Sequence, residues 1–506
     1  MKKIFLLLLS IFTLGACEDE LDLAPISDPG SNGFYKTTDD FIQAINGVYS
    51  ALGGINPTAV GTAGQGQPDY YIDMGEVRSD NIYIQGNGPA EYAEIGNFLT
   101  TIAGIPTINN AWNGTYEGIM RANTVLDKLK ENPGAVPDDN MRRRIEGEAR
   151  FLRAYFYFDL VKWFGKVPVV TTFVSPTEAL TIGRSPVSEV YDVIIADLEF
   201  AASALPRSYG GADLGRATSW AAKGILARVY MTRSGPKLHP DGPCLGSNEY
   251  GKAIGLLNEI IGSNEFSMLT NYADIFDYDN ENNAEIIFDV QYGTGAGGLF
   301  PTDYYDQPWG AANLPFAGGN PGDRVKRVSD DLMSTYEMGD KRVAPTVLEG
   351  YLDAGGNQVD NRFFIKFIDK SKAGGDRFMW PINFPVLRYT DVLMLKAECI
   401  LQGASGTQGD VDKIVSDVRD RAGLGPVSNV TLDMLLAERR KEFAAECLRW
   451  DDLVRTGKVV DVMNNWRAAE DASGKVQPVS VNSILYPIPQ NQLDVKQGLY
   501  DQNPGY

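Results

Sequence analysis

The stretch from Asp139 to Phe164 constrains the fold more than any other part of this 506-residue chain. Apolar residues recur on it at helical spacing along two separate stripes, whereas a surface helix needs only one. The first stripe is Ile145, Ala149, Leu152, Phe156, Leu160 and Trp163, and the second is Phe151, Tyr155 and Phe158. Gly165 and Pro168 follow, as is common where a helix ends. Two stripes predict a helix that is buried on both sides, in a protein with several packed layers of helices.

Further helical patterns precede and follow this stretch. They lie at residues 41–52, 111–130, 186–204, 217–233, 250–262, 386–402, 410–422 and 432–455. Successive helical hairpins that cannot bury their apolar faces alone are typical of a solenoid. The tetratricopeptide consensus is not visible, so only the spacing supports this type of repeat. The predicted fold class is all-α: a tetratricopeptide-like helical-repeat solenoid with an inserted irregular lobe that contains a little β structure.

Two regions interrupt the helical pattern. Residues 53–110 are rich in Gly, Asn and Tyr and are expected to be mostly irregular. From Ala284 to Tyr292 apolar residues alternate, which predicts a strand. The next segment, residues 293–322, combines eight glycines with several large aromatic residues. A loop of this length is usually functional or disordered, and its aromatic residues argue against disorder.

The N-terminus has the composition of a secretory signal. A basic start precedes an apolar run, residues 4–12, that is too short to span a bilayer. The Leu-Gly-Ala-Cys sequence that ends at Cys17 resembles the lipobox of bacterial lipoproteins, and an acidic run follows it. On this interpretation residues 1–16 are a signal peptide, Cys17 carries a lipid, and residues 17–33 form a tether. The alternative is an ordinary signal peptide with a chance cysteine.

Charge and composition exclude several classes of function. The formal net charge of −20 repels phosphate backbones and anionic lipid, so nucleic acid is not an expected partner and uncharged ligands are favoured. The single histidine, His239, lies in a loop-like sequence without a nucleophile motif, which argues against histidine-assisted catalysis. Besides Cys17 there are three cysteines and no C-x-x-C pair, so neither disulfides nor a zinc site is predicted. No cofactor is expected.

Charged residues alternate with apolar ones in the segment 436–454. The charged residues are Glu438, Arg439, Arg440, Glu442, Glu446 and Arg449. Charges on a half-buried helix need partners, because burying an unpaired charge costs several kcal/mol. We therefore predict a structural ion-pair lattice that ties helices together, in preference to an active site. The same prediction applies to Glu148, Arg150 and Arg153.

Two acidic patterns are possible signs of a functional site. Glycoside hydrolysis needs two carboxylates roughly 5–10 Å apart, but among 66 acidic residues chance pairs are inevitable, and no catalytic pair is predicted. Asp277, Asp279, Glu281 and Asn283 place oxygen ligands at alternate positions, as a calcium loop does. The position that requires glycine holds Asn282, so a solvated loop is favoured and no metal site is predicted.

Four motifs occur in order along the chain. They are Glu148–Leu160 with Trp163-Phe164-Gly165, Leu387–Glu398, Glu438–Lys458, and Tyr486–Gln490 with Gln502–Tyr506. Behind the lipobox-like N-terminus, this succession resembles the SusD/RagB family of outer-membrane lipoproteins from Bacteroidetes. By that resemblance, residues 34–265 form an N-terminal SusD-like helical-repeat region, 266–385 an irregular lobe, and 386–506 a C-terminal RagB/SusD helical region.

The resemblance implies a function outside the cell. Family members are cell-surface glycan binders seated over a TonB-dependent transporter of the SusC type. By that resemblance, the chain would be lipid-anchored in the outer membrane and face the exterior. It would capture an oligosaccharide or polysaccharide without cleaving it and present it to the transporter. An extracellular glycoside hydrolase and a solenoid scaffold that binds only proteins remain as alternatives.

Two aromatic-rich segments are candidates for the glycan site. A pyranose can stack its apolar face on an aromatic ring while Asn, Asp and Arg side chains bind its hydroxyl groups. The candidate residues are Tyr71, Arg78, Asn81 and Tyr83 in the first segment, and Tyr292, Tyr304, Tyr305 and Trp309 in the second. No family motif matches these positions, and for each ring ordinary loop packing is the alternative.

Overall fold

The computed structural model describes residues 33–53, 66–85, 91–292, 325–352, 358–369, 371–372 and 380–506. Helices dominate these ranges. No helix in the described ranges combines the length and the apolar character that a membrane-spanning helix requires.

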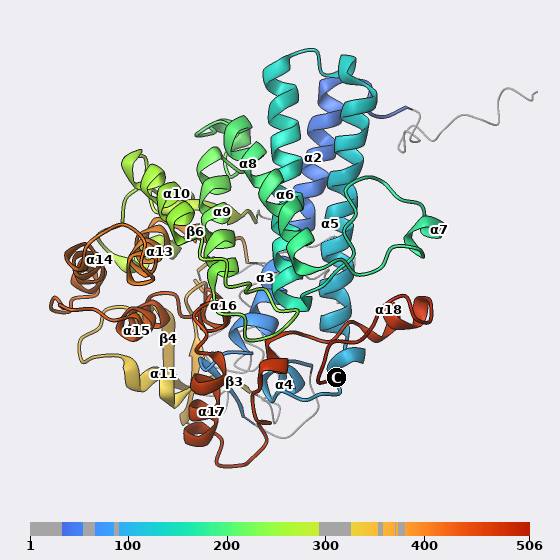
Figure 1. Cartoon of the computed structure of the whole chain (residues 1–506). Coiled ribbons are helices and arrows are strands. Elements are labelled where there is room, and N and C mark those ends of the chain that lie inside the picture. Colours follow the sequence, from blue (N-terminus) through green and yellow to red (C-terminus); the bar gives the residue numbers. More distant parts are fainter. Residues whose placement is uncertain are drawn as a thin grey trace, which may run out of the picture.

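The large helices form one continuous array (Figure 1). They are α2 (Thr38–Gly53), α5 (Pro106–Glu131), α6 (Asp139–Phe164), α8 (Val187–Ala204), α9 (Ser219–Ser234), α10 (Tyr250–Gly262), α13 (Tyr389–Leu401), α14 (Gln408–Arg421) and α15 (Leu432–Glu442). Neighbours in the chain pack on each other: α5 contacts α2 and α6, and the series continues through α8, α9 and α10 to α13, which contacts α14 and α15. The predicted all-α helical-repeat fold is confirmed.

Helix α6 lies between α5 and α8, as its two apolar stripes predict. Every residue from Phe151 to Val161 is buried. The helix begins where the Asp138 side chain accepts a hydrogen bond from the N–H of Met141, at 2.7 Å. It ends at Gly165, whose φ of +69° favours glycine. Local capping therefore sets both ends, and they agree with the sequence prediction.

Strand β2 (Ile286–Val290) confirms the strand predicted within residues 284–292. It pairs antiparallel with β6 (Phe384–Arg388), so the helix predicted from residue 386 is wrong at its start and α13 begins at Tyr389. The periodicity of a short apolar run is compatible with a helix or a strand, and here the pairing with β2 makes it a strand. The segment between β2 and β6 leaves and returns at adjacent strands, which makes it an insertion between α10 and α13. The predicted domain boundaries near residues 265 and 385 stay predictions.

The described parts of residues 53–110 contain more regular structure than predicted. They contain α3 (Gln67–Tyr71), a π-helical turn (Ile72–Glu76), β1 (Ile82–Gln85), α4 (Glu91–Gly96) and a 3-10 turn (Ile102–Gly104). These elements are too short to show a helical or strand period in the sequence, and tertiary contacts stabilise them.

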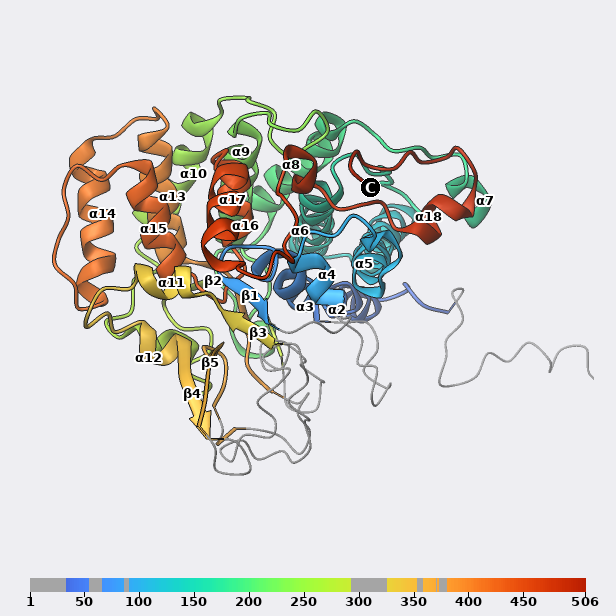
Figure 2. The ribbon, with the colours of Figure 1, turned by 90° about the horizontal axis from the view of Figure 1, so that it is seen from below.

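Short strands gather on one side of the row of helices (Figure 2). Strand β1 pairs antiparallel with β3 (Val325–Val328), and β4 (Val347–Leu352) pairs with β5 (Gln358–Phe364). The short helices α11 (Asp330–Thr335) and α12 (Val343–Thr346) lie between β3 and β4 in the chain. The irregular lobe of the prediction thus contains a little β structure.

The helix predicted at 432–455 is two helices, α15 and α16 (Arg449–Arg455). Between them Ala445 and Cys447 adopt positive φ angles of +69° and +61°. The buried carboxylate of Glu76 accepts hydrogen bonds from the N–H groups of both residues, each at 3.0 Å. Glu76 thus satisfies donors that the turn leaves outside the helical ladder. Local periodicity could not predict this break, because its acceptor comes from a distant part of the chain.

The C-terminal region runs through α17 (Val459–Glu470) and α18 (Gln490–Val495) and returns to the end of α6. The N–H of Tyr486 donates to the carbonyl oxygen of Trp163 at 2.7 Å, and the Asn503 amide donates to that of Phe164 at 3.0 Å. These bonds hold the tail against the centre of the array.

Helices α5 and α6 approach closely at Gly118. A Cβ atom added there would lie 2.4 Å from Cε2 of Phe156, whose ring is fully buried. Gly47 in α2 is different, because a Cβ there would meet nothing within 4 Å.

We expect Gly118→Ala to destabilise the protein by about 1–3 kcal/mol, because a buried ring must shift. This cost should outweigh the better helix propensity of Ala, which is worth about 0.8–1.0 kcal/mol. Gly47→Ala is the matched control and should stabilise the protein. Urea denaturation would measure both, and equal stabilisation by the two changes would contradict the close approach.

Candidate functional site

A cluster of buried charges joins the inserted segment to the C-terminal helices, and we call it the charge cluster. Its members are Glu285, Asp340, Arg342, Lys366, Arg388, Arg421, Glu438, Glu442 and Glu446, none more than 8% exposed. Arg388 lies 2.5 Å from the carboxylate of Glu285 and 2.7 Å from that of Glu446. Arg421 bridges Glu285, at 2.7 Å, and Glu442, at 2.5 Å. The structural ion-pair lattice predicted from the sequence is confirmed.

The four cations of the charge cluster, Arg342, Lys366, Arg388 and Arg421, were not predicted as members of the lattice. Arg342 pairs with Asp340 at 2.7 Å and with Glu438 at 2.6 Å, and Lys366 pairs with Glu446 at 2.9 Å. Neither cation lies in a recognisable motif. For Lys366 the one indication in the sequence is that it is a single cation between apolar residues, Ile365 and Phe367.

The arginines of the 436–454 segment contact other elements. Arg439 pairs with Asp391 at 2.7 Å and with Asp452 at 2.8 Å. Arg449 binds both carboxylate oxygens of Asp80, each at 2.8 Å. Burial would raise the pKa of Asp80, but the guanidinium groups of Arg440 and Arg449 outweigh it and lower this pKa to about 2. Arg440 and Arg449 therefore connect α15 and α16 to the N-terminal half, and Arg439 ties α15 to α13 and α16.

The second predicted set of charges is also structural. Glu148 binds Arg144 and Arg216, each at 2.8 Å. Arg153 pairs with Asp197 at 2.8 Å, and Arg150 reaches the same carboxylate at 3.2 Å. Helix α6 is thereby tied to α8 and to the chain before α9.

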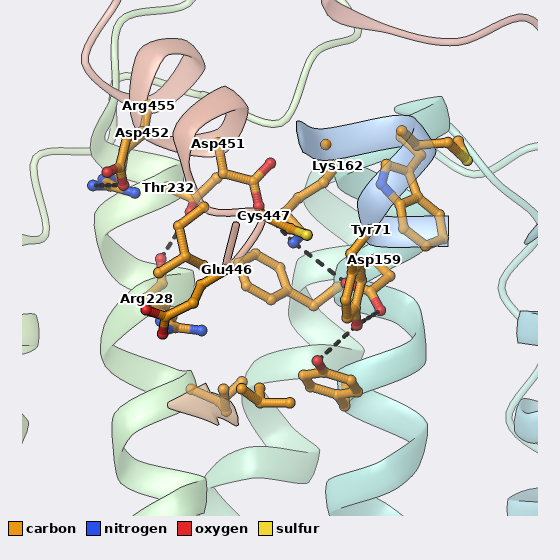
Figure 3. A pocket seen from close by; sticks show the side chains of 18 of the residues that line it. Tyr71, Asp159, Lys162, Arg228, Thr232, Glu446, Cys447, Asp451, Asp452 and Arg455 are labelled. Carbon is orange, nitrogen blue, oxygen red and sulfur yellow. Dashed lines mark hydrogen bonds and ion pairs between the residues drawn. The ribbon is translucent and has the colours of Figure 1, made fainter. Parts of the chain in front are cut away.

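A small polar cavity lies beside the charge cluster, between α6, α9 and the turn before α16 (Figure 3). Tyr71 points toward Asp159, with 2.5 Å between its hydroxyl oxygen and Oδ2. Lys162 lies 2.7 Å from Asp451 and 3.3 Å from Asp159. Burial raises the pKa of Asp159 to about 6, although Lys162 opposes the shift. The cavity volume of about 60 Å³ has room for a few water molecules but not for a sugar ring.

Two of the predicted site residues, Tyr71 and Tyr292, contact adjacent residues at the start of β6. The ring of Tyr71 lies 6.0 Å from that of Phe384, centroid to centroid. The N–H of Tyr292 donates to the Asn383 side chain at 2.8 Å. The Tyr292 hydroxyl is buried and has no hydrogen-bond partner among the described residues. The structure thus brings together one residue from each of the two predicted segments.

Arg78 and Asn81 lie in the interior, 1% and 0% exposed, where a surface ligand would not reach them. Arg78 donates to the carbonyl oxygens of Ile95 and Ser483, each at 3.0 Å. Asn81 donates to Glu76 at 2.8 Å and accepts from Arg440 at 2.8 Å. For these two residues the predicted ligand contact is wrong, because the C-terminal region covers them and occupies their polar groups.

Tyr83 is 8% exposed and lies on β1. Its hydroxyl oxygen lies 3.0 Å from Oδ1 of Asp471 and 3.1 Å from the Ser473 hydroxyl. The ring packs against Trp466, 6.3 Å away. Tyr83 is therefore engaged with the loop after α17 and is separate from the pair Tyr71 and Tyr292.

The other predicted residues lie outside the described ranges. These are Tyr304, Tyr305 and Trp309 of the candidate glycan site, and Cys17, the predicted lipid attachment point. Their roles stay predictions.

The acidic run after residue 276 is occupied by protein contacts. Lys372 binds Asp279 at 2.6 Å, and the Glu281 carboxylate accepts from the N–H of Asn383 at 2.7 Å. Within the described ranges no three acidic, histidine or cysteine side chains form a group that could hold a metal ion. Asp279 and Glu281 are thus engaged by protein groups, and the solvated loop stays a prediction.

The three cysteines of the described chain are buried and form no disulfide with one another. Burial raises the pKa of Cys244 to about 12, which keeps this thiol protonated and unreactive. His239 is also buried, and its Nδ1 accepts a hydrogen bond from the N–H of Asp241 at 3.1 Å. None of these contacts forms a nucleophile–base pair.

Two family models match the chain. One, described as starch-binding associating with outer membrane, matches residues 83–231, and the other, described as SusD family, matches residues 304–506. The SusD-like protein P25 of Formosa agariphila is 26% identical, with 98% of each chain covered.

Solved structures share the fold. Surface glycan-binding protein A from Bacteroides uniformis superimposes with a TM-score of 0.77 at 24% identity, covering 93% of this chain and 100% of that one. A structure titled as a laminarin-binding SusD-like protein gives a TM-score of 0.73 at 25% identity, with the same coverage.

The helical-repeat array, its single insertion and the two matched regions define a SusD-like protein. The chain belongs to the SusD/RagB family.

We expect Glu442→Gln to destabilise the protein by about 3–5 kcal/mol at neutral pH, because buried guanidinium groups lose their counter-charge. Burial would raise the pKa of Glu442, but Arg421, Arg388 and Arg342 lower it to about 2, below the ordinary value of 4.5. The stability that Glu442 contributes is therefore present above about pH 4.5 and is lost as the pH falls through 2. The difference between variant and wild type should shrink over this range.

The matched control is Asp417→Asn, which breaks an exposed pair with Lys413. Its cost should stay within about 1 kcal/mol. Urea denaturation at several pH values measures both variants. A pH-independent or equally small effect of Glu442→Gln would contradict the role assigned to the charge cluster.

Proposed function

We propose that this protein is a non-catalytic binding protein for uncharged polysaccharide at the outer membrane, and that it presents its ligand to a TonB-dependent transporter of the SusC type. The observation that carries the proposal is the family match, which falls on both the helical array and the C-terminal region. Relatives of this fold carry names that state surface glycan binding and laminarin binding.

The charge and the aromatic residues support the ligand class. A net charge of −20 disfavours polyanions but leaves neutral saccharides unaffected. Tyr71 and Tyr292 flank β6, the strand by which the inserted segment returns to the array. Tyr304, Tyr305 and Trp309 belong to that same segment, and we propose that they provide stacking surfaces for pyranose rings.

The environment of two acidic residues argues for binding without cleavage. A glycosidase needs a carboxylic acid of raised pKa beside its sugar. Asp159 has a raised pKa of about 6, but it lines the small cavity and contacts Tyr71. Burial raises the pKa of Asp289 to about 7, yet this side chain is 4% exposed and bound to Gln291. Neither acid is placed to protonate a glycosidic oxygen.

Binding can be tested by affinity electrophoresis in gels that contain laminarin, soluble starch or arabinoxylan. We expect at least one of these polysaccharides to retard the protein. The substitutions Tyr304→Ala and Trp309→Ala, made together, should weaken that retardation. The melting temperature of this variant should stay within a few degrees of wild type. Phe200→Ala, which truncates a half-buried ring on α8, is the control and should bind normally.

A reducing-sugar assay on the same polysaccharides tests for cleavage, and turnover by the purified protein would favour the hydrolase alternative. Retardation that both loop substitutions leave unchanged would remove residues 304–309 from the site.

The proposed lipid anchor predicts that Cys17→Ser moves the protein from the membrane fraction to the soluble fraction. Two or more acyl chains hold a protein stably at a membrane, whereas a serine at this position cannot accept them through sulfur. Fractionation of cells that express each form measures the shift. A serine variant that stays with the membranes would contradict the anchor.

A further inference from the structure

A second hollow lies on the helical array, and we call it the array groove. It is bounded by α5, by the loop of residues 168–182 that carries α7 (Pro176–Ala179), and by α18 with the C-terminal tail. These elements lie together at one end of the molecule in both Figure 1 and Figure 2. The groove has a volume of about 330 Å³, within the usual range for small-ligand sites. None of the residues predicted for the first site lines it.

The outer wall of the array groove is held by hydrogen bonds to α5. The Tyr116 hydroxyl donates to the carbonyl oxygen of Pro168 at 2.8 Å, and the Asn123 amide donates to that of Val170 at 3.0 Å. The Asp127 carboxylate accepts from the N–H of Phe173 at 2.7 Å. The loop backbone is thus fixed to α5 at three residues.

Two large apolar side chains on this wall and floor face solvent. Phe173 is 60% exposed and Met120 is 43% exposed. Covering exposed apolar side chains beside a hollow removes apolar surface from water, so their position favours contact with a ligand. Trp112 and Tyr500, whose rings lie 6.3 Å apart, also line the groove.

The groove also offers neutral hydrogen-bonding groups. Trp112 is 3% exposed, and its indole N–H has no acceptor among the described residues. The indole nitrogen is not sealed from solvent, so it stays accessible. Asn113 and Gln492 lie at the rim, with 3.1 Å between their amide groups. Glu117 is the one charged residue of the described lining, and it pairs with Arg121 at 2.9 Å.

We propose that the array groove is a second saccharide-binding site, which takes one or two uncharged sugar rings. The inference rests on the proposed function. Phe173 would provide the stacking face, and the Trp112 N–H with the Asn113 and Gln492 amides would bind hydroxyl groups. The absence of Lys and Arg from the described lining makes an anionic ligand a poor fit. Two sites on one chain raise the affinity for a long polysaccharide through effective concentration.

The test counts sugar-binding sites by calorimetric titration with laminarihexaose, maltohexaose and xylohexaose, the oligomers of the three polysaccharides above. We expect two bound hexasaccharides per wild-type chain for the sugar that binds, and one for Phe173→Ala combined with Asn113→Ala. Both side chains are exposed, so the variant should fold. Its affinity for the polysaccharide should fall about three- to tenfold, as the loss of one aromatic contact implies.

Gln492→Ala is a second variant that leaves the ring in place, and it should weaken the same titration step. Met338→Ala is the matched control, since it truncates a fully exposed apolar side chain outside the groove. A wild-type stoichiometry of one, or an unchanged stoichiometry of two in the double variant, would overturn the second site.

The outcomes separate the second site from the proposed function. A wild-type protein that binds none of the three hexasaccharides would contradict both the proposed function and the second site. Normal saccharide stoichiometry in the double variant, together with weaker co-purification of the transporter, would make the groove a protein-docking surface and overturn the saccharide assignment.

Discussion

Charges buried away from water must be paired, and this requirement governs how the insertion meets the helical array. Glu285 comes from the chain before β2, Arg388 from the end of β6, Arg421 from the end of α14, and Glu442 from the end of α15. Each would be costly to bury alone, so the four segments are stable only in each other's presence. The pairing of β2 with β6, and with it the place where the insertion leaves the array, depends on this arrangement.

Local patterns predicted the array well because its helices carry their own boundaries. Asp138 and Gly165 fix α6 at residues that the sequence already indicates, and α10 was predicted at its observed bounds. The failures have distant causes. The break after Glu442 is stabilised by Glu76, and β6 exists because β2 lies beside it. Neither contact leaves a period in the local sequence.

The candidate site was harder to predict for a related reason. The first candidate segment combines aromatic rings with an arginine and an asparagine. Its sequence pattern is the same whether these polar groups bind a sugar or other parts of the protein. For Arg78 and Asn81 the partners include the Ser483 carbonyl and the Arg440 side chain of the C-terminal half, which only the folded chain brings near. Tyr71 and Tyr292 both contact residues at the start of β6. These contacts also arise only because β6 pairs with β2.

The antiparallel pair β2 and β6 has an evolutionary consequence. Its two strands hold the ends of residues 291–383 side by side, while β3, Arg342 and Lys366 within that stretch are tied to the rest of the protein. Doubling the length of a closed loop costs only about 0.6 kcal/mol in chain entropy. Length changes in those parts of the stretch that do not contact the rest of the protein should therefore cost little in folding, and new ligand preferences can arise there while the contacts of β3, Arg342 and Lys366 are kept.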